Sequence, residues 1–300
     1  MPKVMSGYKD YLDHIKKMTP FERLVYWIKE REEIRLKKEN GWPLPWTEDP
    51  ILRTYRFCNV VRMEDKVSKW LLNHWYKPYF DHHNMLVACT LARHFNNPGA
   101  LQYITAQVFG EKQGIPNYKP DVIKKTLRHV KENGQTVFSG AYMIHGVGTM
   151  DKIGMVVDMV CQPLIDNPPV LNTNSVQECV ETLVEGYWGF SSFLAGQVVA
   201  DLVWAIKGTW TDKHTWAPVG PGSRKGMYRL LEQYSPMKQE EFTGHLNNLI
   251  TKLKEVLPRE LSDRMVAQDT QSTLCEFDKY ERTLLGEGKP KQKYNGMHTL

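Results

Sequence analysis

The chain has 300 residues, 41% hydrophobic and 24% charged, so it can bury a sizeable core in one large domain or two small ones. Its 39 lysines and arginines outnumber 34 acidic residues, and the net charge of +5 is compatible with a polyanionic partner without requiring one. The five cysteines are widely spaced and form no CxxC pair, which argues against a disulfide framework and a zinc knuckle.

The N-terminal stretch, MPKVMSGYKDYLDHIKK, is charged within a few residues, and no long apolar run occurs there or later. The sequence therefore predicts neither a signal peptide nor a membrane span. We expect a reducing, cytoplasmic setting. Residues 1–20 are predicted to be an N-terminal extension.

Hydrophobic residues recur with helical spacing along the rest of the chain. One apolar stripe, Ile123, Leu127 and Val130, lies between a helix start at Pro120 and a stop at Gly134. Two further stripes, the first of them behind Asp151 as N-cap, consist of Ile153, Val156, Val157, Val160, Cys161 and Leu164, and of Phe242, Leu246, Leu249, Ile250, Leu253 and Val256. No segment alternates convincingly with a period of two, so we predict an all-α protein.

Proline and glycine clusters mark loops between these helices rather than long linkers, and no internal repeat is found. We therefore predict one integrated helical body over residues 21–285, built as one or two helical lobes. Residues 286–300 lack apolar periodicity and are predicted to be a flexible tail.

The stretch YRFCNVVRMEDKVSKW, residues 55–70, is the first candidate for a functional site. Arg56, Asn59, Arg62 and Asp65 recur every three residues, and aromatic residues lie among them. If the second half is helical, Arg62, Asp65 and two following lysines share a face and form a basic strip. A solvated helix with local ion pairs is the alternative.

A second candidate is VEGYWGFSSFLAGQVVADLVWAIKG, residues 184–208. A turn containing Gly186 and Gly189 enters an apolar helix that carries Gln197 and Asp201 at i and i+4. A buried carboxylate needs partners, so Asp201 is either paired with an arginine or lysine in the core or available as a base.

The third candidate is the turn GPGSRKGM, residues 220–227. Gly220 and Gly222 let the backbone approach a ligand closely, while the Ser223 hydroxyl and the Arg224 guanidinium favour an anion such as phosphate. The spacing differs from the GxxxxGK[ST] loop of nucleotide-binding proteins. A plain turn with surface cations is the alternative.

The fourth candidate, CEFDKYER at residues 275–282, has the spacing of intrahelical ion pairs between Glu276 and Lys279 and between Asp278 and Arg282. Such pairs contribute only about 0.3–0.5 kcal/mol each and usually decorate solvated faces. The histidines add little, because neither HExxH nor a His/Cys set with ligand spacing occurs, and no dedicated metal site is predicted.

Together and in this order, four strings resemble the phage DNA hypermodification enzymes called alpha-glutamyl/putrescinyl thymine pyrophosphorylases, or amino acid:DNA transferases. The strings are EREEIRLKKENGWPLPWTEDPILRTYRFCNVVRMEDKVSKWL, GFSSFLAGQVVADL, GPGSRKG and CEFDKYER, and the resemblance runs from about Phe21 to Arg282. That family is related to the helical part of 5-hydroxymethyluracil DNA kinases and is similar to helical DNA glycosylases. The resemblance implies a multi-helix, glycosylase-like fold related to helix-hairpin-helix proteins.

Two features depart from the pattern of those families. The glycosylase hairpin reads Gly-apolar-Gly, whereas two residues separate Gly186 from Gly189 here. The kinase relatives carry a P-loop domain, and no P-loop sequence occurs in this chain, which argues against ATP as phosphoryl donor.

The resemblance implies that the substrate is double-stranded DNA whose thymine-like base carries a pyrophosphorylated 5-hydroxymethyl group. An amino acid or polyamine then displaces pyrophosphate. Asp201 is the first candidate for the base that accepts the amine proton and Glu276 the second, with Arg62 and Lys279 stabilising the leaving group. The further binding candidates are Arg56, Asn59, Asp65, Gln197, Gly220, Gly222, Ser223, Arg224, Asp278 and Arg282. A divalent metal such as Mg²⁺, held by Asp65 or Asp278, is an additional option.

Two other functions stay open at this point. A glycosylase or lyase acting on a modified base would use a similar fold, and a non-catalytic module could recruit other DNA modification enzymes. An RNA-binding helical protein is disfavoured only by the family resemblance, because charge does not distinguish RNA from DNA.

Overall fold

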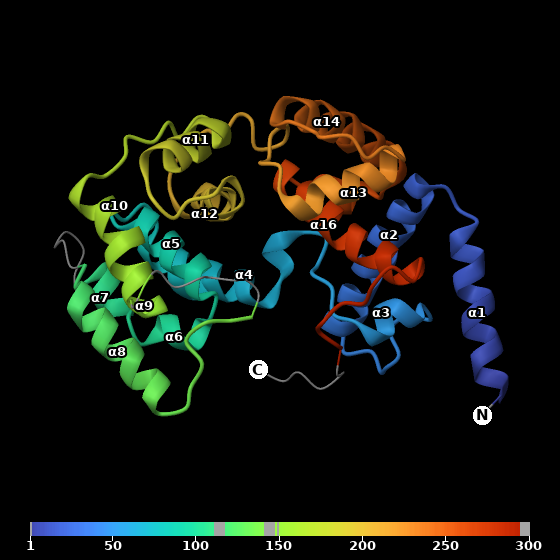
Figure 1. Cartoon of the computed structure of the whole chain (residues 1–300), viewed down its shortest axis with the longest axis horizontal. Coiled ribbons are helices and arrows are strands. Elements are labelled where there is room, and N and C mark those ends of the chain that lie inside the picture. The colour runs from blue at the N-terminus through green and yellow to red at the C-terminus, as the bar shows by residue number, and fades with distance from the viewer. Residues whose placement is uncertain (1, 111–117, 141–147, 149, 295–300) are drawn as a thin grey trace. The chain divides into compact units, whose positions relative to one another are not determined.

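The computed structural model describes residues 2–110, 118–140, 148 and 150–294, with side chains from residue 9 onward (Figure 1). Within these ranges, the regular secondary structure is helical. One isolated antiparallel bridge joins Tyr55 to Lys293. The all-α prediction is therefore confirmed. No helix in the described ranges has both the length and the apolar character needed to cross a membrane.

The chain divides into two compact units, of which unit 1 combines residues 1–64 with residues 214–300. Its elements are α1 (Pro2–Lys16), α2 (Pro20–Glu39), α3 (Pro50–Thr54), the 3₁₀ turn η1 (Arg62–Glu64), α13 (Pro221–Leu231), α14 (Gln239–Val256), α15 (Arg259–Ser262) and α16 (Ala267–Leu284). Unit 1 is thus built from both ends of the sequence.

Helix α16 is the central element of unit 1. It buries residues around most of its circumference, including Leu274, Phe277 and Tyr280, which have no exposed surface. Helices α2, α13 and α14 all contact it. A helix buried on several sides is normally apolar, yet α16 also buries several polar side chains, and these must find partners inside the unit.

Unit 2 consists of residues 65–213. Its elements are α4 (Lys66–Trp70), the π-helical η2 (Leu71–Tyr76), η3 (Lys77–Tyr79), α5 (Met85–Phe95), α6 (Pro98–Gln102), α7 (Thr105–Phe109), α8 (Pro120–Glu132), α9 (Lys152–Gly154), the π-helical η4 (Met155–Cys161), α10 (Gln162–Asp166), α11 (Val176–Gly186) and α12 (Ser192–Ala205). Helix α5 is buried along almost its whole length and contacts α12, η2 and η4.

Local sequence signals explain several helix boundaries. The Thr19 hydroxyl accepts the Glu22 N–H at 3.3 Å while Glu22 accepts the Thr19 N–H at 2.7 Å, which forms a capping box at the start of α2. Asp151 accepts the Gly154 N–H at 2.6 Å, so its predicted N-cap role is confirmed. Gly189, with φ of +89°, turns the chain from α11 into α12, and a Cβ there would lie 2.9 Å from Val160 Cγ2.

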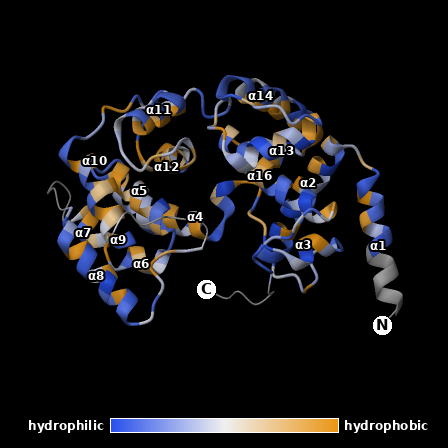
Figure 2. Ribbon diagram, in the orientation of Figure 1, coloured by the Kyte–Doolittle hydropathy of each residue, from blue (hydrophilic) through white to orange (hydrophobic). Residues whose placement is uncertain are grey.

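The three predicted apolar stripes form helix faces. Ile123, Leu127 and Val130 are buried on α8, whose apolar and polar residues alternate along the ribbon in Figure 2. The stripe from Ile153 to Leu164 is buried but runs through the π-helical η4. On α14, Val256 is 40% exposed because it is the last residue of the helix.

Candidate functional site

A polar strip runs along one face of α16 in unit 1. Its members recur at i, i+3, i+4, i+7, i+8 and i+11, which places them on one helix face. They are Gln268, Gln271, Ser272, Cys275, Glu276 and Lys279. The two glutamines are buried, and Gln268 Nε2 donates to Gln271 Oε1 at 2.7 Å. The two buried amides of the strip are therefore hydrogen-bonded to each other.

The loop after α3 lies along this helix and is held by three contacts. The Cys58 N–H donates to Glu276 Oε2 at 3.0 Å, and the Arg62 N–H donates to Asp269 Oδ1 at 2.7 Å. Lys279 Nζ lies 4.7 Å from the centroid of the Phe57 ring, a cation–π arrangement. Residues 57 and 58 of the first motif thus lie against the motif at residues 275–282.

Glu276 and Lys279 form an ion pair within the polar strip. Their side-chain atoms are 2.6 Å apart, and the side chains keep 15% and 23% of their surface exposed. The pair is therefore partly desolvated but remains within reach of a ligand. A carboxylate and an ammonium group in such a setting can accept a proton and bind an anion, respectively.

The Asn59 side chain also holds this loop in place. Its Oδ1 accepts a hydrogen bond from Arg31 Nη2 at 2.7 Å, and its Nδ2 donates to the Glu64 carbonyl at 2.8 Å. Arg56 is exposed, and its backbone N–H donates to the Gln292 carbonyl at 3.1 Å. These bonds position the loop and leave the Arg56 side chain at the surface.

The turn at residues 220–226 begins α13, with Gly220 as N-cap. Ser223 Oγ accepts the Gly220 N–H at 3.0 Å and a hydrogen bond from Gln271 Nε2, also at 3.0 Å. Ser223 has no exposed surface, so its hydroxyl caps the helix and joins it to the polar strip. From the sequence we expected this hydroxyl to favour a phosphate, whereas in the structure it is hydrogen-bonded to Gly220 and Gln271.

The glycines of the turn serve helix packing. A Cβ at Gly226 would lie 2.1 Å from the Leu274 carbonyl oxygen, and one at Gly222 would lie 3.0 Å from Cys275 Sγ. The backbone of α13 therefore approaches α16 closely. From the sequence we expected Gly220 and Gly222 to let the backbone approach a ligand instead. Burial raises the pKa of the Cys275 thiol to about 12, so this thiol stays protonated at neutral pH.

Arg224 follows the turn and is half-buried. Its Nε is buried and has no hydrogen-bond partner among the residues that the structure describes. A buried guanidinium donor without a protein partner is rare, and a bound anion would satisfy it.

Asp278 and Arg282 belong to a separate ion network near the C-terminal end of α16. The Asp278 carboxylate accepts hydrogen bonds from Arg229 Nε at 2.8 Å and Arg282 Nε at 3.1 Å, and Arg229 also pairs with Glu287 at 2.6 Å. Asp278 is 4% exposed. Two guanidinium groups already neutralise this carboxylate, which suits a structural tie between α13 and α16 better than metal binding.

The remaining predicted residues, Asp65, Gln197 and Asp201, belong to unit 2. Asp65 is the N-cap of α4, and Gln197 and Asp201 lie buried on α12. Asp201 pairs with Arg93 of α5, whose Nη2 lies 2.5 Å from Asp201 Oδ1, and it accepts the Tyr76 hydroxyl at 2.6 Å. Burial and the Asp201 charge raise the pKa of Tyr76 well above its usual value, so the tyrosine stays a donor.

Asp201 has no exposed surface. Its geometry is that of a satisfied core ion pair, which is one of the two alternatives that the sequence left open. Among the described residues, no group of three or more His, Cys, Asp or Glu side chains is arranged to hold a metal ion.

Sequence reasoning missed Gln268, Gln271 and Asp269. The signal was present, because amides at i and i+3 on a helix that also carries Leu274 and Phe277 indicate a buried polar face. Arg31 and Arg93 were missed as well, since only the fold brings them to Asn59 and Asp201.

These observations define an all-α protein with a polar strip on the central helix of one unit and a buried ion pair in the other. Residues 19–289 match the family model described as "5-hmdU DNA kinase, helical domain", so the chain belongs to this family. The "5-hmdU DNA kinase" of Bacillus phage SP10 is 26% identical over 289 residues, covering 84% of this chain and 43% of the relative. The chain thus spans less than half the length of that relative. No solved structure matches the chain.

Proposed function

We propose that this protein acts in phage thymine hypermodification and replaces the pyrophosphate of 5-(pyrophosphoryloxymethyl)uracil in DNA with an amine. Membership of the family named for a DNA kinase supports a role in DNA modification. The observation that carries the proposal is the polar strip of α16. It offers a carboxylate and an ammonium group 2.6 Å apart, beside the loop at residues 57–62.

In the proposed reaction, the bond between the exocyclic methylene carbon and the pyrophosphate oxygen breaks, and its electrons leave with pyrophosphate. The lone pair of the incoming amine forms the new carbon–nitrogen bond, and the resulting ammonium loses a proton to a carboxylate. Charge develops on the leaving group, so fixed cations in a partly desolvated site stabilise the transition state. We assign this role to Lys279, Arg62 and Arg224.

We assign the proton acceptor to Glu276. Asp201 is fully buried and held by Arg93 and Tyr76, whereas Glu276 keeps part of its surface exposed. When pyrophosphate binds, its charge attracts the Lys279 ammonium away from Glu276, and the released carboxylate accepts the amine proton. Mg²⁺ would add further positive charge at the leaving group, and comparing turnover with and without a chelator tests that addition.

The proposal is tested by incubating the protein with DNA that contains pyrophosphorylated 5-hydroxymethyluracil, together with glycine, glutamate or putrescine. Nucleoside mass spectrometry after digestion should detect the aminated base, and released pyrophosphate should match it in amount. An abasic site would identify a glycosylase instead. Unchanged DNA in every amine mixture would leave the binding-module alternative standing and overturn the proposal.

Arg224→Ala sharpens this test. If Arg224 binds the leaving group, the variant should lose turnover by about 10²-fold or more while DNA affinity changes little. Arg259→Ala removes the same charge from an exposed position of α15 and should be neutral in both measurements. Equal losses of turnover and affinity in Arg224→Ala would assign this arginine to the DNA backbone.

A further inference from the structure

We propose that unit 1 binds the phosphate backbone of double-stranded DNA through a basic surface that is separate from the polar strip. The cations of this basic surface come from three segments, and they are Lys9, Lys16, Arg53, Arg56, Lys291 and Lys293. The inference rests on the proposed function only in taking DNA as the partner.

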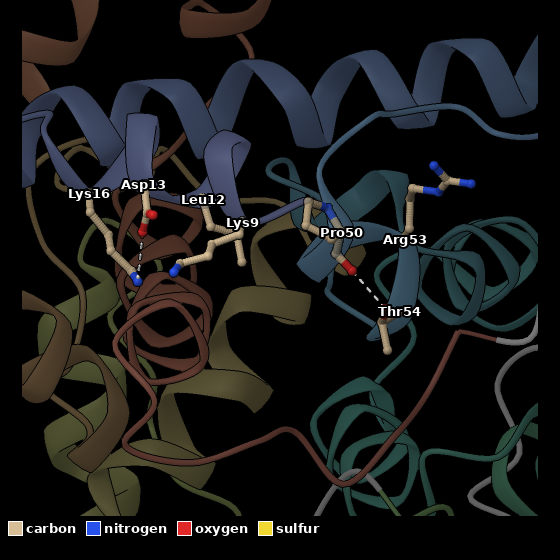
Figure 3. Close-up of a pocket in the computed structure, with 7 residues that line it drawn as sticks. All are labelled: Lys9, Leu12, Asp13, Lys16, Pro50, Arg53 and Thr54. Atoms are coloured by element: carbon tan, nitrogen blue, oxygen red, sulfur yellow. Dashed lines mark hydrogen bonds and ion pairs between the residues drawn. The ribbon is translucent and has the colours of Figure 1, made fainter. Parts of the chain in front are cut away.

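The first part of the basic surface is a groove of about 700 Å³ between α1 and α3. Lys9 and Lys16 come from the α1 wall and Arg53 from the α3 wall, while Leu12 and Pro50 provide apolar lining (Figure 3). The Arg53 side chain extends away from the two lysines, which spreads the positive charge along the groove.

Helix α1 is fixed to the rest of unit 1, so the groove has a defined wall. Ile15 is 2% exposed in the core, and the hydroxyl groups of Tyr11 and Tyr26 are hydrogen-bonded at 2.8 Å. A wall held in place in this way presents its lysines without a large ordering cost on binding.

The second part of the basic surface begins directly after Arg53. The C-terminal segment, red in Figure 1, passes beside α3 and pairs with residues 54–56. The Tyr294 N–H donates to the Thr54 carbonyl at 2.8 Å, and the Arg56 N–H donates to the Gln292 carbonyl at 3.1 Å. This pairing places the exposed Lys291 and Lys293 next to the exposed Arg56.

The charge of the basic surface is only partly compensated within the protein. Lys16 pairs with Asp13 at 3.4 Å, and Arg53 pairs with Glu48 at 3.6 Å. Both pairs are solvent-exposed, and such pairs contribute little to stability, so a phosphate can replace the carboxylate. The surface thus carries six cations, and these two carboxylates pair with two of them.

The arrangement of the charges favours a linear polyanion. Cations spread over α1, residues 53–56 and the C-terminal segment suit successive phosphates better than one isolated anion. Double-stranded DNA presents about one negative charge per 1.7 Å of helix axis, and each neutralised phosphate releases counterions. Binding through this surface should therefore depend strongly on salt concentration.

The experiment measures binding of the full chain to a short, unmodified DNA duplex over a salt titration. Lys291→Gln/Lys293→Gln should weaken binding about tenfold or more at low salt, and the slope of log K against log salt should fall by about 1.8, or about 0.9 for each lost phosphate contact. Lys9→Gln/Lys16→Gln should have a similar effect. Lys252→Gln/Lys254→Gln removes the same charge from the exposed face of α14 and is the matched control.

Equal weakening by the control would show that only net charge matters and would overturn the proposal, as would an unchanged salt slope in both surface variants. Equal binding of an RNA duplex would overturn the choice of DNA as partner. Because the duplex is unmodified and the readout is affinity, failure of amine transfer leaves this test intact. Loss of binding in the surface variants with normal thermal unfolding separates the effect from misfolding.

Discussion

The two units each contain a carboxylate paired with a cation, and the pairs differ chiefly in burial. Asp201 and Arg93 in unit 2 have side chains that are 0% and 4% exposed, whereas Glu276 and Lys279 in unit 1 are 15% and 23% exposed. A fully buried pair satisfies itself and contacts no solute, while a partly exposed pair can exchange its partner for a ligand. The same kind of ion pair therefore suits core packing in unit 2 and, in the proposed function, proton transfer in unit 1.

Asp201→Asn is expected to have the largest effect, because it removes the carboxylate charge that pairs with the buried Arg93 guanidinium. We expect unit 2 to lose about 3–5 kcal/mol of stability. Hydrogen exchange of α5 and α12 measures this loss within the unit. Unfolding of the whole chain is less suitable, because a protein of two units need not unfold in a two-state manner. The triple change Arg93→Met, Asp201→Leu and Tyr76→Phe removes the two charges and the tyrosine hydroxyl together and should restore much of the protection. Normal protection in Asp201→Asn alone would contradict this account of the pair.

Glu276→Gln should show the opposite behaviour to Asp201→Asn. The amide keeps the shape and accepts the Cys58 N–H but cannot take the amine proton, so turnover should fall by at least about 10²-fold. Stability should change by less than about 1 kcal/mol, since the pair is partly solvated. Glu255→Gln, at an exposed position of α14, is the matched control for turnover on pyrophosphorylated DNA. Full activity in Glu276→Gln would remove Glu276 as the base.

His94 provides a pH test of unit 2. It is 4% exposed, and burial lowers the pKa of its imidazole to about 4, below the ordinary value of 6.5. The unfolded chain therefore binds a proton between pH 6.5 and 4 that the folded unit does not. The contribution of the neutral, buried His94 to the stability of unit 2 is complete above pH 6.5 and decreases by up to roughly 3 kcal/mol as the pH falls to about 4. Hydrogen exchange of α5 over this range should show the decrease, and His94→Gln should flatten it. An identical pH slope in the variant would assign the effect to other groups.

Gly226→Ala should have a smaller effect, confined to unit 1. The added Cβ would meet the Leu274 carbonyl at 2.1 Å, so α13 must shift away from α16. We expect a loss of about 1–3 kcal/mol, measured by hydrogen exchange of α13. Gly244→Ala on α14 has no atom within 4 Å of the new Cβ and should not destabilise the unit. A stable Gly226→Ala variant would show that the two helices have room to separate.

The sequence alone determined the helical class, because apolar residues at helical spacing and caps such as Asp151 act over a few residues. It also singled out residues 55–70 and 275–282, since clustered charges among aromatic residues are visible without a fold. The multi-helix glycosylase-like fold, the domain limits and the roles of individual site residues stay predictions.

Only the tertiary structure decided which partner each charged or polar group has. Asp201 could be assigned to packing once Arg93 and Tyr76 were found around it, and Ser223 to capping once Gly220 and Gln271 were found beside it. The close contact of Gly226 with Leu274 likewise joins residues that lie far apart in the sequence. Burial and pairing depend on such long-range contacts, whereas local spacing reports only which residues share a helix face.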